Sequence, residues 1–170
     1  MIAGADSAVG VESLFRTHRL AMVRLALLLV DDRETAEDVA QEAFAALHRR
    51  WNALSSDAAA VAYLRTCVVN GSRSILRRRR TARLHATTAN DVVTVPAADG
   101  PALLGEEHRE VLAALRRLPA RQREVLVLRY WSELTESQIA QTLGISVGAV
   151  KSSASRGRDA IAAQLEGQQR

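Results

Sequence analysis

Lysine, arginine and serine side chains lie close together near the end of the chain. Lys151, Ser152, Ser155 and Arg156 follow the tripeptide Gly-Ile-Ser at residues 144–146. Ammonium, guanidinium and hydroxyl groups can bind the edges of base pairs in the major groove of DNA. This segment is therefore a candidate DNA-reading surface, and an α-hairpin with solvated polar residues is the alternative.

Two short helices would position these side chains. Thr135, followed three residues later by Gln138, matches a capping box and predicts a helix over residues 136–143. Gly144 suits the left-handed position after that helix, and Ser146 suits the cap of the next one. A three-residue turn between helices is the spacing of a helix-turn-helix, whose second helix enters the major groove. The apolar residues expected between these helices are Ile139, Ala140, Leu143, Ile145 and Val150.

A helix expected over residues 34–51 presents a second candidate surface. Asp38, Gln41 and Glu42 would be exposed acceptors opposite its apolar stripe, and such acceptors suit a basic partner surface. The alternative is that they only keep the helix surface soluble. The stripe consists of Ala36, Val39, Ala40, Ala43, Phe44, Leu47 and Trp51.

Two further helices are expected over residues 11–30 and 58–80, with Asp31 and Asp32 ending the first. The inner stripe of the first helix would be Leu14, His18, Ala21, Leu25 and Leu28. The other helix ends in four consecutive arginines at residues 77–80. Such a run is either a solvated helix end favoured by the dipole or a nucleic-acid contact, and the nearby Asn70 favours the second interpretation.

Charge divides the chain into two basic modules and an acidic connector. Basic residues outnumber acidic ones 12 to 9 in residues 1–80 and 10 to 6 in residues 108–170. Residues 81–107 hold one arginine and four acids. Basic modules favour phosphate backbones, although a net charge of +4 is equally compatible with an ordinary soluble protein.

Apolar residues recur at helical spacing in both modules, which predicts an all-α fold. We expect a first domain over residues 11–80, a linker over 81–105 and a helix-turn-helix domain over 106–166. The linker is rich in small and polar residues and contains two of the three prolines. We therefore expect it to be flexible, so that the two modules change their relative position.

Other classes of protein have little support in the sequence. The single cysteine, Cys67, excludes an internal disulfide and a cysteine-rich zinc site, and its apolar surroundings suggest a core thiol. The longest apolar run, residues 25–30, is too short to span a membrane, and no signal peptide is expected, so we predict a cytoplasmic protein. The scattered histidines suggest no catalytic or metal site, and we expect no cofactor. They are His18, His48, His85 and His108.

Three segments resemble the extracytoplasmic-function sigma factors. Within that family the chain is most similar to a sigma-E-like actinobacterial subgroup. The three segments are residues 38–44 (DVAQEAF), 62–70 (AYLRTCVVN) and 143–152 (LGISVGAVKS). The resemblance implies that the first module is sigma region 2, which binds polymerase and the opened −10 element. The second would be region 4, which reads the −35 duplex. Implied partners are core RNA polymerase, through its β′ clamp helices and β flap, promoter DNA and an anti-sigma factor.

The same resemblance assigns roles to individual residues. Contacts to the clamp helices would come from Asp38, Gln41 and Glu42. Contacts to the −10 element would come from Asn70, Arg73 and Arg77. Contacts to the −35 element would come from Arg129, Ser146, Lys151, Ser152, Ser155, Arg156 and Arg158. The amide of Asn70 can both donate and accept, so it could read the Watson–Crick edge of an unstacked base.

The chain departs from the family pattern in both modules. Residues 71–75 (GSRSI) replace the aromatic residues that often help to melt DNA, and Gly157 lies inside the recognition helix. Glycine costs a helix up to about 1 kcal/mol relative to alanine, so we expect the helix to fray there or its backbone to approach DNA closely. Two other functions stay open: a repressor or activator that uses the helix-turn-helix without polymerase, and an adaptor that acts mainly by binding proteins.

Overall fold

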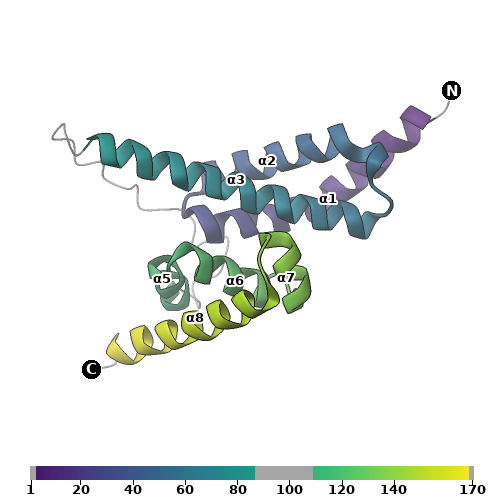
Figure 1. Cartoon of the computed structure of the whole chain (residues 1–170). Helices are drawn as coiled ribbons and strands as arrows, with labels where there is room; N and C mark the ends of the chain where they lie inside the picture. Colours follow the sequence, from purple (N-terminus) through teal and green to yellow (C-terminus); the bar gives the residue numbers. More distant parts are fainter. Residues whose placement is uncertain (1–2, 87–108, 169–170) are drawn as a thin grey trace.

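The computed structural model describes residues 3–86 and 109–168, which form two helical bundles (Figure 1). The first bundle contains α1 (Ala3–Val30), α2 (Arg33–Arg50), the 3₁₀ turn η1 (Trp51–Ala53) and α3 (Asp57–Ala86). The second contains α5 (Arg109–Arg117), α6 (Ala120–Tyr130), α7 (Glu136–Leu143) and α8 (Val147–Gln168). The described ranges contain no strand, and the predicted all-α fold is confirmed.

Two long helices extend beyond their predicted ends. α1 begins at Ala3 instead of residue 11, and α3 continues to Ala86 instead of ending at residue 80. Residues 81–86, predicted as the start of the linker, are therefore helical. The rest of the predicted linker lies outside the described residues. No helix in the described part of the chain combines the length and apolarity that a membrane span requires.

The turn between α1 and α2 is made by the two consecutive aspartates, as predicted. Asp31 adopts a left-handed backbone with φ of 76°, a conformation that ends the helix and that aspartate tolerates better than most residues. Asp32 caps α2, since its Oδ1 accepts a hydrogen bond of 2.9 Å from the Thr35 backbone N–H. Local chemistry at two residues therefore separates the two helices.

The first bundle buries the stripe predicted for α2 almost completely. Every member of it is buried except Trp51, which is half-buried. On α1 the prediction was less accurate, because Ala21 is exposed whereas residues 25–30 are all buried. A helix segment that is apolar all round must be covered on all sides. Here α2 and α3 cover part of this segment, and α5 and α6 of the second bundle also pack against α1.

The second bundle follows the predicted local signals closely. The capping box of Thr135 and Gln138 is present, α7 covers the predicted residues, and Gly144 has φ of 65°. The Ser146 hydroxyl accepts a hydrogen bond of 3.1 Å from the Ala149 N–H and thereby caps α8. The predicted apolar residues pack between α6, α7 and α8, with Ile145 only half-buried. The helix-turn-helix is therefore formed as expected.

Gly157 has a different role from the two that were predicted. It is buried, and α8 continues through it as a regular helix. A Cβ added there would lie 2.9 Å from Leu126 Cδ1 and 3.2 Å from Leu126 Cγ. The glycine therefore lets α6 approach α8 closely. It lies on the buried side of α8, where DNA cannot reach it.

This packing predicts that Gly157→Ala destabilises the protein by about 1 to 2 kcal/mol, although alanine favours a helix. Turning the Leu126 methyl group away would not relieve the contact by itself, because Leu126 Cγ and Gln122 Cβ would also lie within 3.4 Å of the added atom. Gly148→Ala on the same helix is the matched control, because its Cβ would meet only Ser146 Oγ at 3.9 Å. We expect the control to be neutral or stabilising in urea unfolding, and equal effects of the two substitutions would contradict the packing role of Gly157.

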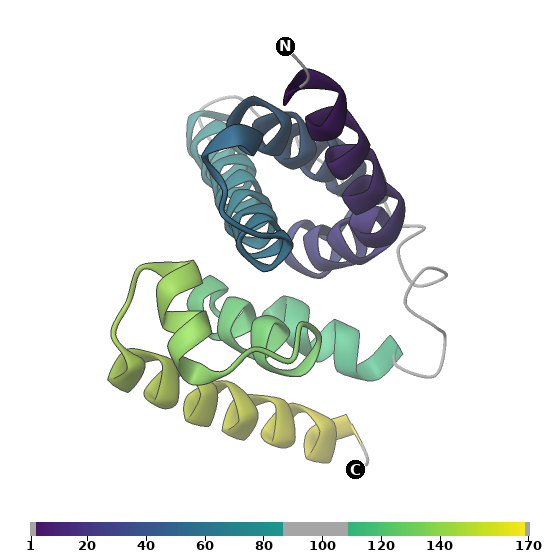
Figure 2. The ribbon, with the colours of Figure 1, turned by 90° about the vertical axis from the view of Figure 1, so that its right-hand side faces the viewer.

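The two bundles lie against each other, as both views of the ribbon show (Figures 1 and 2). α5 and α6 contact α1, and α7 contacts α3. α8 lies on the side of the second bundle that faces away from the first. This arrangement sets which of the predicted functional residues are free to meet a partner.

Candidate polymerase and nucleic-acid interfaces

α2 presents the predicted polar face to solvent. Asp38, Gln41 and Glu42 are all exposed, and the last two lie three and four residues after Asp38, so each is a neighbour of Asp38 on the helix surface. Glu42 Oε1 accepts a hydrogen bond of 3.1 Å from Arg49, and both side chains remain exposed. The face is acidic and separate from the buried stripe, so it could bind a basic partner without disturbing the core.

α3 carries the residues predicted to contact single-stranded DNA, and they differ in availability. Asn70 and Arg77 are exposed. Arg73 is engaged: its Nε and Nη2 donate to the two carboxylate oxygens of Glu124 at 2.6 and 2.7 Å. Glu124 belongs to α6 of the other bundle. The hydrogen bonds to Glu124 raise the pKa of Arg73, so the guanidinium stays charged.

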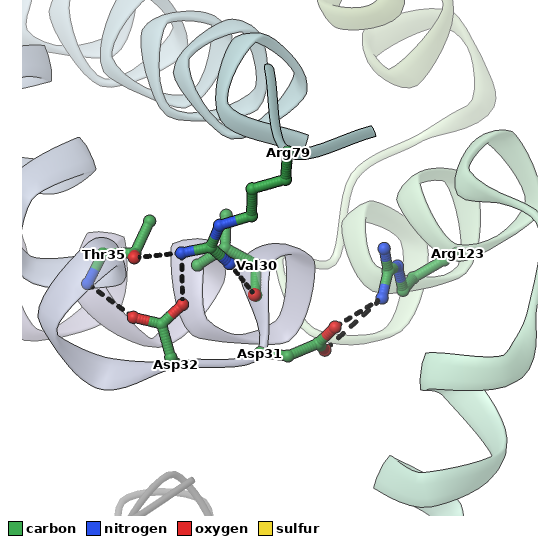
Figure 3. Close-up of polar contacts among 6 residues, drawn as sticks. All are labelled: Val30, Asp31, Asp32, Thr35, Arg79 and Arg123. Carbon is green, nitrogen blue, oxygen red and sulfur yellow. Dashed lines mark hydrogen bonds and ion pairs between the residues drawn. The ribbon is translucent and has the colours of Figure 1, made fainter. Parts of the chain in front are cut away.

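The four-arginine run at the end of α3 divides into two kinds of residue. Arg77, Arg78 and Arg80 are exposed, whereas Arg79 turns back onto the first bundle (Figure 3). Its Nη2 donates to Asp32 Oδ2 at 2.8 Å and to Thr35 Oγ1 at 2.6 Å. Arg79 therefore ties α3 to the turn between α1 and α2, a structural role that neither interpretation of the run included.

The Asp32 carboxylate is charged when it meets Arg79. Burial raises the pKa of Asp32, but hydrogen bonds from Thr35 and Arg79 outweigh it, so the net pKa lies below its ordinary value. The carboxylate stays charged at neutral pH. Its contribution to stability is lost only as the pH falls through this lowered pKa.

The first turns of α8 carry the predicted duplex-reading residues in exposed positions. Lys151, Ser152, Ser155 and Arg156 are all exposed. Arg156 Nη2 donates a long hydrogen bond of 3.4 Å to Ser152 Oγ, a contact weak enough to exchange for a base edge. Ser146 is exposed as well, but its hydroxyl is occupied as the cap of α8.

Glu136 holds two of the basic groups in place, and the sequence pattern did not single it out. Arg129 Nη1 donates to Glu136 Oε1 at 2.9 Å, and Lys151 Nζ lies 3.8 Å from Glu136 Oε2. An acid in the first turn of α7 therefore pairs with a basic residue of α6 and, more loosely, with one of α8. Arg158 lies further along α8 and donates to the Tyr130 hydroxyl at 3.5 Å.

The aromatic and thiol side chains of the first bundle belong to its packing. Trp51 and Tyr63 are half-buried against the core. Burial raises the pKa of the Cys67 thiol, which therefore stays protonated and poorly reactive. Among the described residues, no group of three His, Cys, Asp or Glu side chains could hold a metal ion.

Both modules match known protein families. Residues 14–82 match the family described as Sigma-70 region 2, and residues 108–161 match Sigma-70, region 4. The RNA polymerase sigma-E factor of Streptomyces coelicolor is 32% identical over 148 residues, which are 85% of this chain and 80% of that protein. The chain belongs to the extracytoplasmic-function sigma-70 family. Its function is promoter-specific initiation of transcription by RNA polymerase.

Further relatives of this sigma factor agree with that assignment. The ECF sigma factor SigM of Mycobacterium tuberculosis is 35% identical over 154 residues, covering 91% of this chain and 76% of that protein. The sigma factor RpoE of Bartonella quintana, solved with the anti-sigma factor NepR, has the same fold. It gives a TM-score of 0.74 at 23% identity and covers 91% of this chain and 96% of that one. CnrH, solved with the cytosolic domain of CnrY, gives 0.69 at 26% identity and covers 96% and 94%.

The sigma factor therefore presents three separate groups of predicted contact residues. The group on α2 and the group on α3 belong to the first bundle, and the group around α8 belongs to the second (Figure 1). The structure does not bring the −10 group and the −35 group together. Sigma factors, the family to which the chain belongs, are regulatory proteins.

Proposed function

We propose that each surface of this sigma factor has one task during initiation. The exposed acidic face of α2 binds the β′ clamp helices of core RNA polymerase through Asp38, Gln41 and Glu42. In this proposal the first domain covers residues 11–80 and the second residues 106–166, joined by the linker. The observation that supports it most is the exposed acidic face, opposite an almost completely buried stripe and separate from both basic surfaces.

Promoter DNA meets the other two surfaces. Asn70, Arg73 and Arg77 contact the opened −10 element, where an amide can read an unpaired base and guanidinium groups can bind phosphate. The −35 duplex meets the start of α8, with base edges read by Lys151 and Arg156. The other −35 contacts are proposed to come from Arg129, Ser146, Ser152, Ser155 and Arg158.

Three further features follow from this role. The second domain binds the β flap, so that both domains hold polymerase while they hold DNA. An anti-sigma factor is a proposed partner, because the similar sigma factor RpoE was solved in complex with the anti-sigma factor NepR. We place the protein in the cytoplasm, where its polymerase and promoter are, and assign it no enzymatic activity.

Run-off transcription with core polymerase tests the proposal directly. The chain should make core polymerase initiate at a specific promoter, and RNA of a defined length should depend on both the chain and that promoter. A repressor or activator would instead bind duplex DNA tightly alone, and an adaptor would give no promoter-dependent RNA. Either of those results would contradict the assignment.

A further inference from the structure

A single acid lies within the basic surface at the start of α8. Glu136, in the first turn of α7, has one carboxylate oxygen beside each of two basic groups. Its Oε1 accepts the hydrogen bond of 2.9 Å from Arg129 Nη1, whereas its Oε2 lies 3.8 Å from Lys151 Nζ. The chain has no other acid between Leu134 and Arg158. A lone negative charge is therefore part of the surface that is proposed to meet the −35 duplex.

The two contacts of this carboxylate differ in kind. Arg129 and Glu136 are each about one-third exposed, and their separation is that of a charge-assisted hydrogen bond. The Lys151 side chain is 64% exposed, and 3.8 Å is beyond hydrogen-bond distance, so only the attraction between the two charges links it to Glu136. Glu136 therefore fixes Arg129 but merely biases Lys151, whose ammonium group can still move to DNA.

An acid at this place opposes the binding of DNA in general. Affinity for duplex of any sequence comes from contacts to phosphate, and such contacts carry no sequence information. The flexible side chain of Lys151 can reach either a guanine edge or a phosphate group. A carboxylate that attracts this ammonium group and repels phosphate makes the phosphate contact less favourable than the base contact.

We propose that Glu136 is a positioning residue that sets specificity at the −35 element, because it keeps Lys151 off the phosphates and commits it to a base edge. This rests on the proposed function, in which Lys151 reads the −35 duplex. Selectivity is then gained by weakening the wrong contact, at the expense of total affinity. The alternative is that Glu136 only stabilises the N-terminus of α7, where the helix dipole favours an acid.

The substitution Glu136→Gln separates these two roles. Glutamine keeps an oxygen that can accept the hydrogen bond from Arg129, but it loses the charge that attracts Lys151. Glu110→Gln is the matched control, because Glu110 is also an exposed acid in the first turn of a helix of the second bundle. Its helix, α5, lies at the opposite end of that bundle from α7 (Figure 1). Both variants lose one charge at the same helix position, and only one of them loses it beside Lys151.

Fluorescence anisotropy with the full chain and a labelled duplex of mixed sequence, without a promoter, measures binding that involves no base reading. Glu136→Gln should tighten this binding by about fivefold. The slope of log affinity against log salt concentration should steepen by about 0.9, which corresponds to one further phosphate contact. The steepening should disappear when Lys151→Ala is combined with Glu136→Gln, and Glu110→Gln should leave the slope unchanged.

Selection by polymerase carrying the full chain, from a pool of promoter duplexes randomised only over the −35 element, measures base preference. Glu136→Gln should weaken the preference by about fivefold at the positions where Lys151→Ala removes it, and Glu110→Gln should not. An unchanged salt slope, an unchanged preference, or equal effects in the Glu110 variant would overturn the positioning role. If polymerase with the unchanged chain selected no −35 sequence at all, the proposed function itself would be wrong.

Discussion

Reversal of two charges, in the variant Asp38→Arg with Glu42→Arg, is expected to abolish binding to core RNA polymerase. Both side chains are exposed on α2, so two arginines there would meet the basic surface that the acids are proposed to bind. Like charges placed opposite each other at an interface cost several kcal/mol, which corresponds to a loss of affinity of roughly a thousandfold or more. The fold should survive, because both acids are exposed and the surface pair between Glu42 and Arg49 contributes little to stability.

Fluorescence anisotropy with labelled protein and core polymerase measures this loss. A control of equal charge change is Asp159→Arg with Glu166→Arg, two exposed acids on the later part of α8. The control should bind core polymerase with nearly the affinity of the unchanged protein, and both variants should melt at nearly the same temperature. If the α2 variant kept its affinity, or if the control lost as much, α2 would not be the clamp-binding surface.

Substitutions at Arg156 and Asn70 should separate the two DNA-reading tasks. Arg156→Ala should cost roughly 1 to 3 kcal/mol of binding to promoter duplex and should relax sequence preference only at the −35 element. An arginine on a recognition helix can bind guanine in two places, and alanine cannot make that pairing. Asn70→Ala should leave duplex affinity unchanged, because its amide is proposed to read a base only after the strands separate.

The measurements are duplex binding at the −35 element and open-complex formation at the −10 element. Asn70→Ala should weaken open complexes, and templates already melted at the −10 element should reduce its defect only if Asn70 helps to drive melting. Arg117→Ala is the control, since Arg117 is exposed on α5 and belongs to neither proposed DNA surface. A changed −10 preference in the Arg156 variant, or altered duplex binding in the Asn70 variant, would refute the division between the modules.

Much of the fold could be predicted from the sequence because it depends on neighbouring residues. The capping box at Thr135, the left-handed Gly144 and the cap at Ser146 each act within a few residues of their own position. The stripe of α2 was predictable for the same reason, since its residues recur at the helical period. The exposed candidates Asp38 and Lys151 followed from these local elements, because a helix that buries one face exposes the other.

The tertiary structure alone decided the roles of residues whose partners are distant in the chain. Arg79 resembles its neighbours in the arginine run, and only the fold places it beside Asp32. Arg73 likewise meets Glu124 only when the bundles come together. From the sequence, Gly157 is a residue that weakens its helix. Only the fold places Leu126 against it. The sequence by itself determined the helices, their caps and their exposed faces, because these depend on contacts within one or two turns. Which charged side chains are free and which are already paired depends on packing between helices, and local patterns carry no record of that.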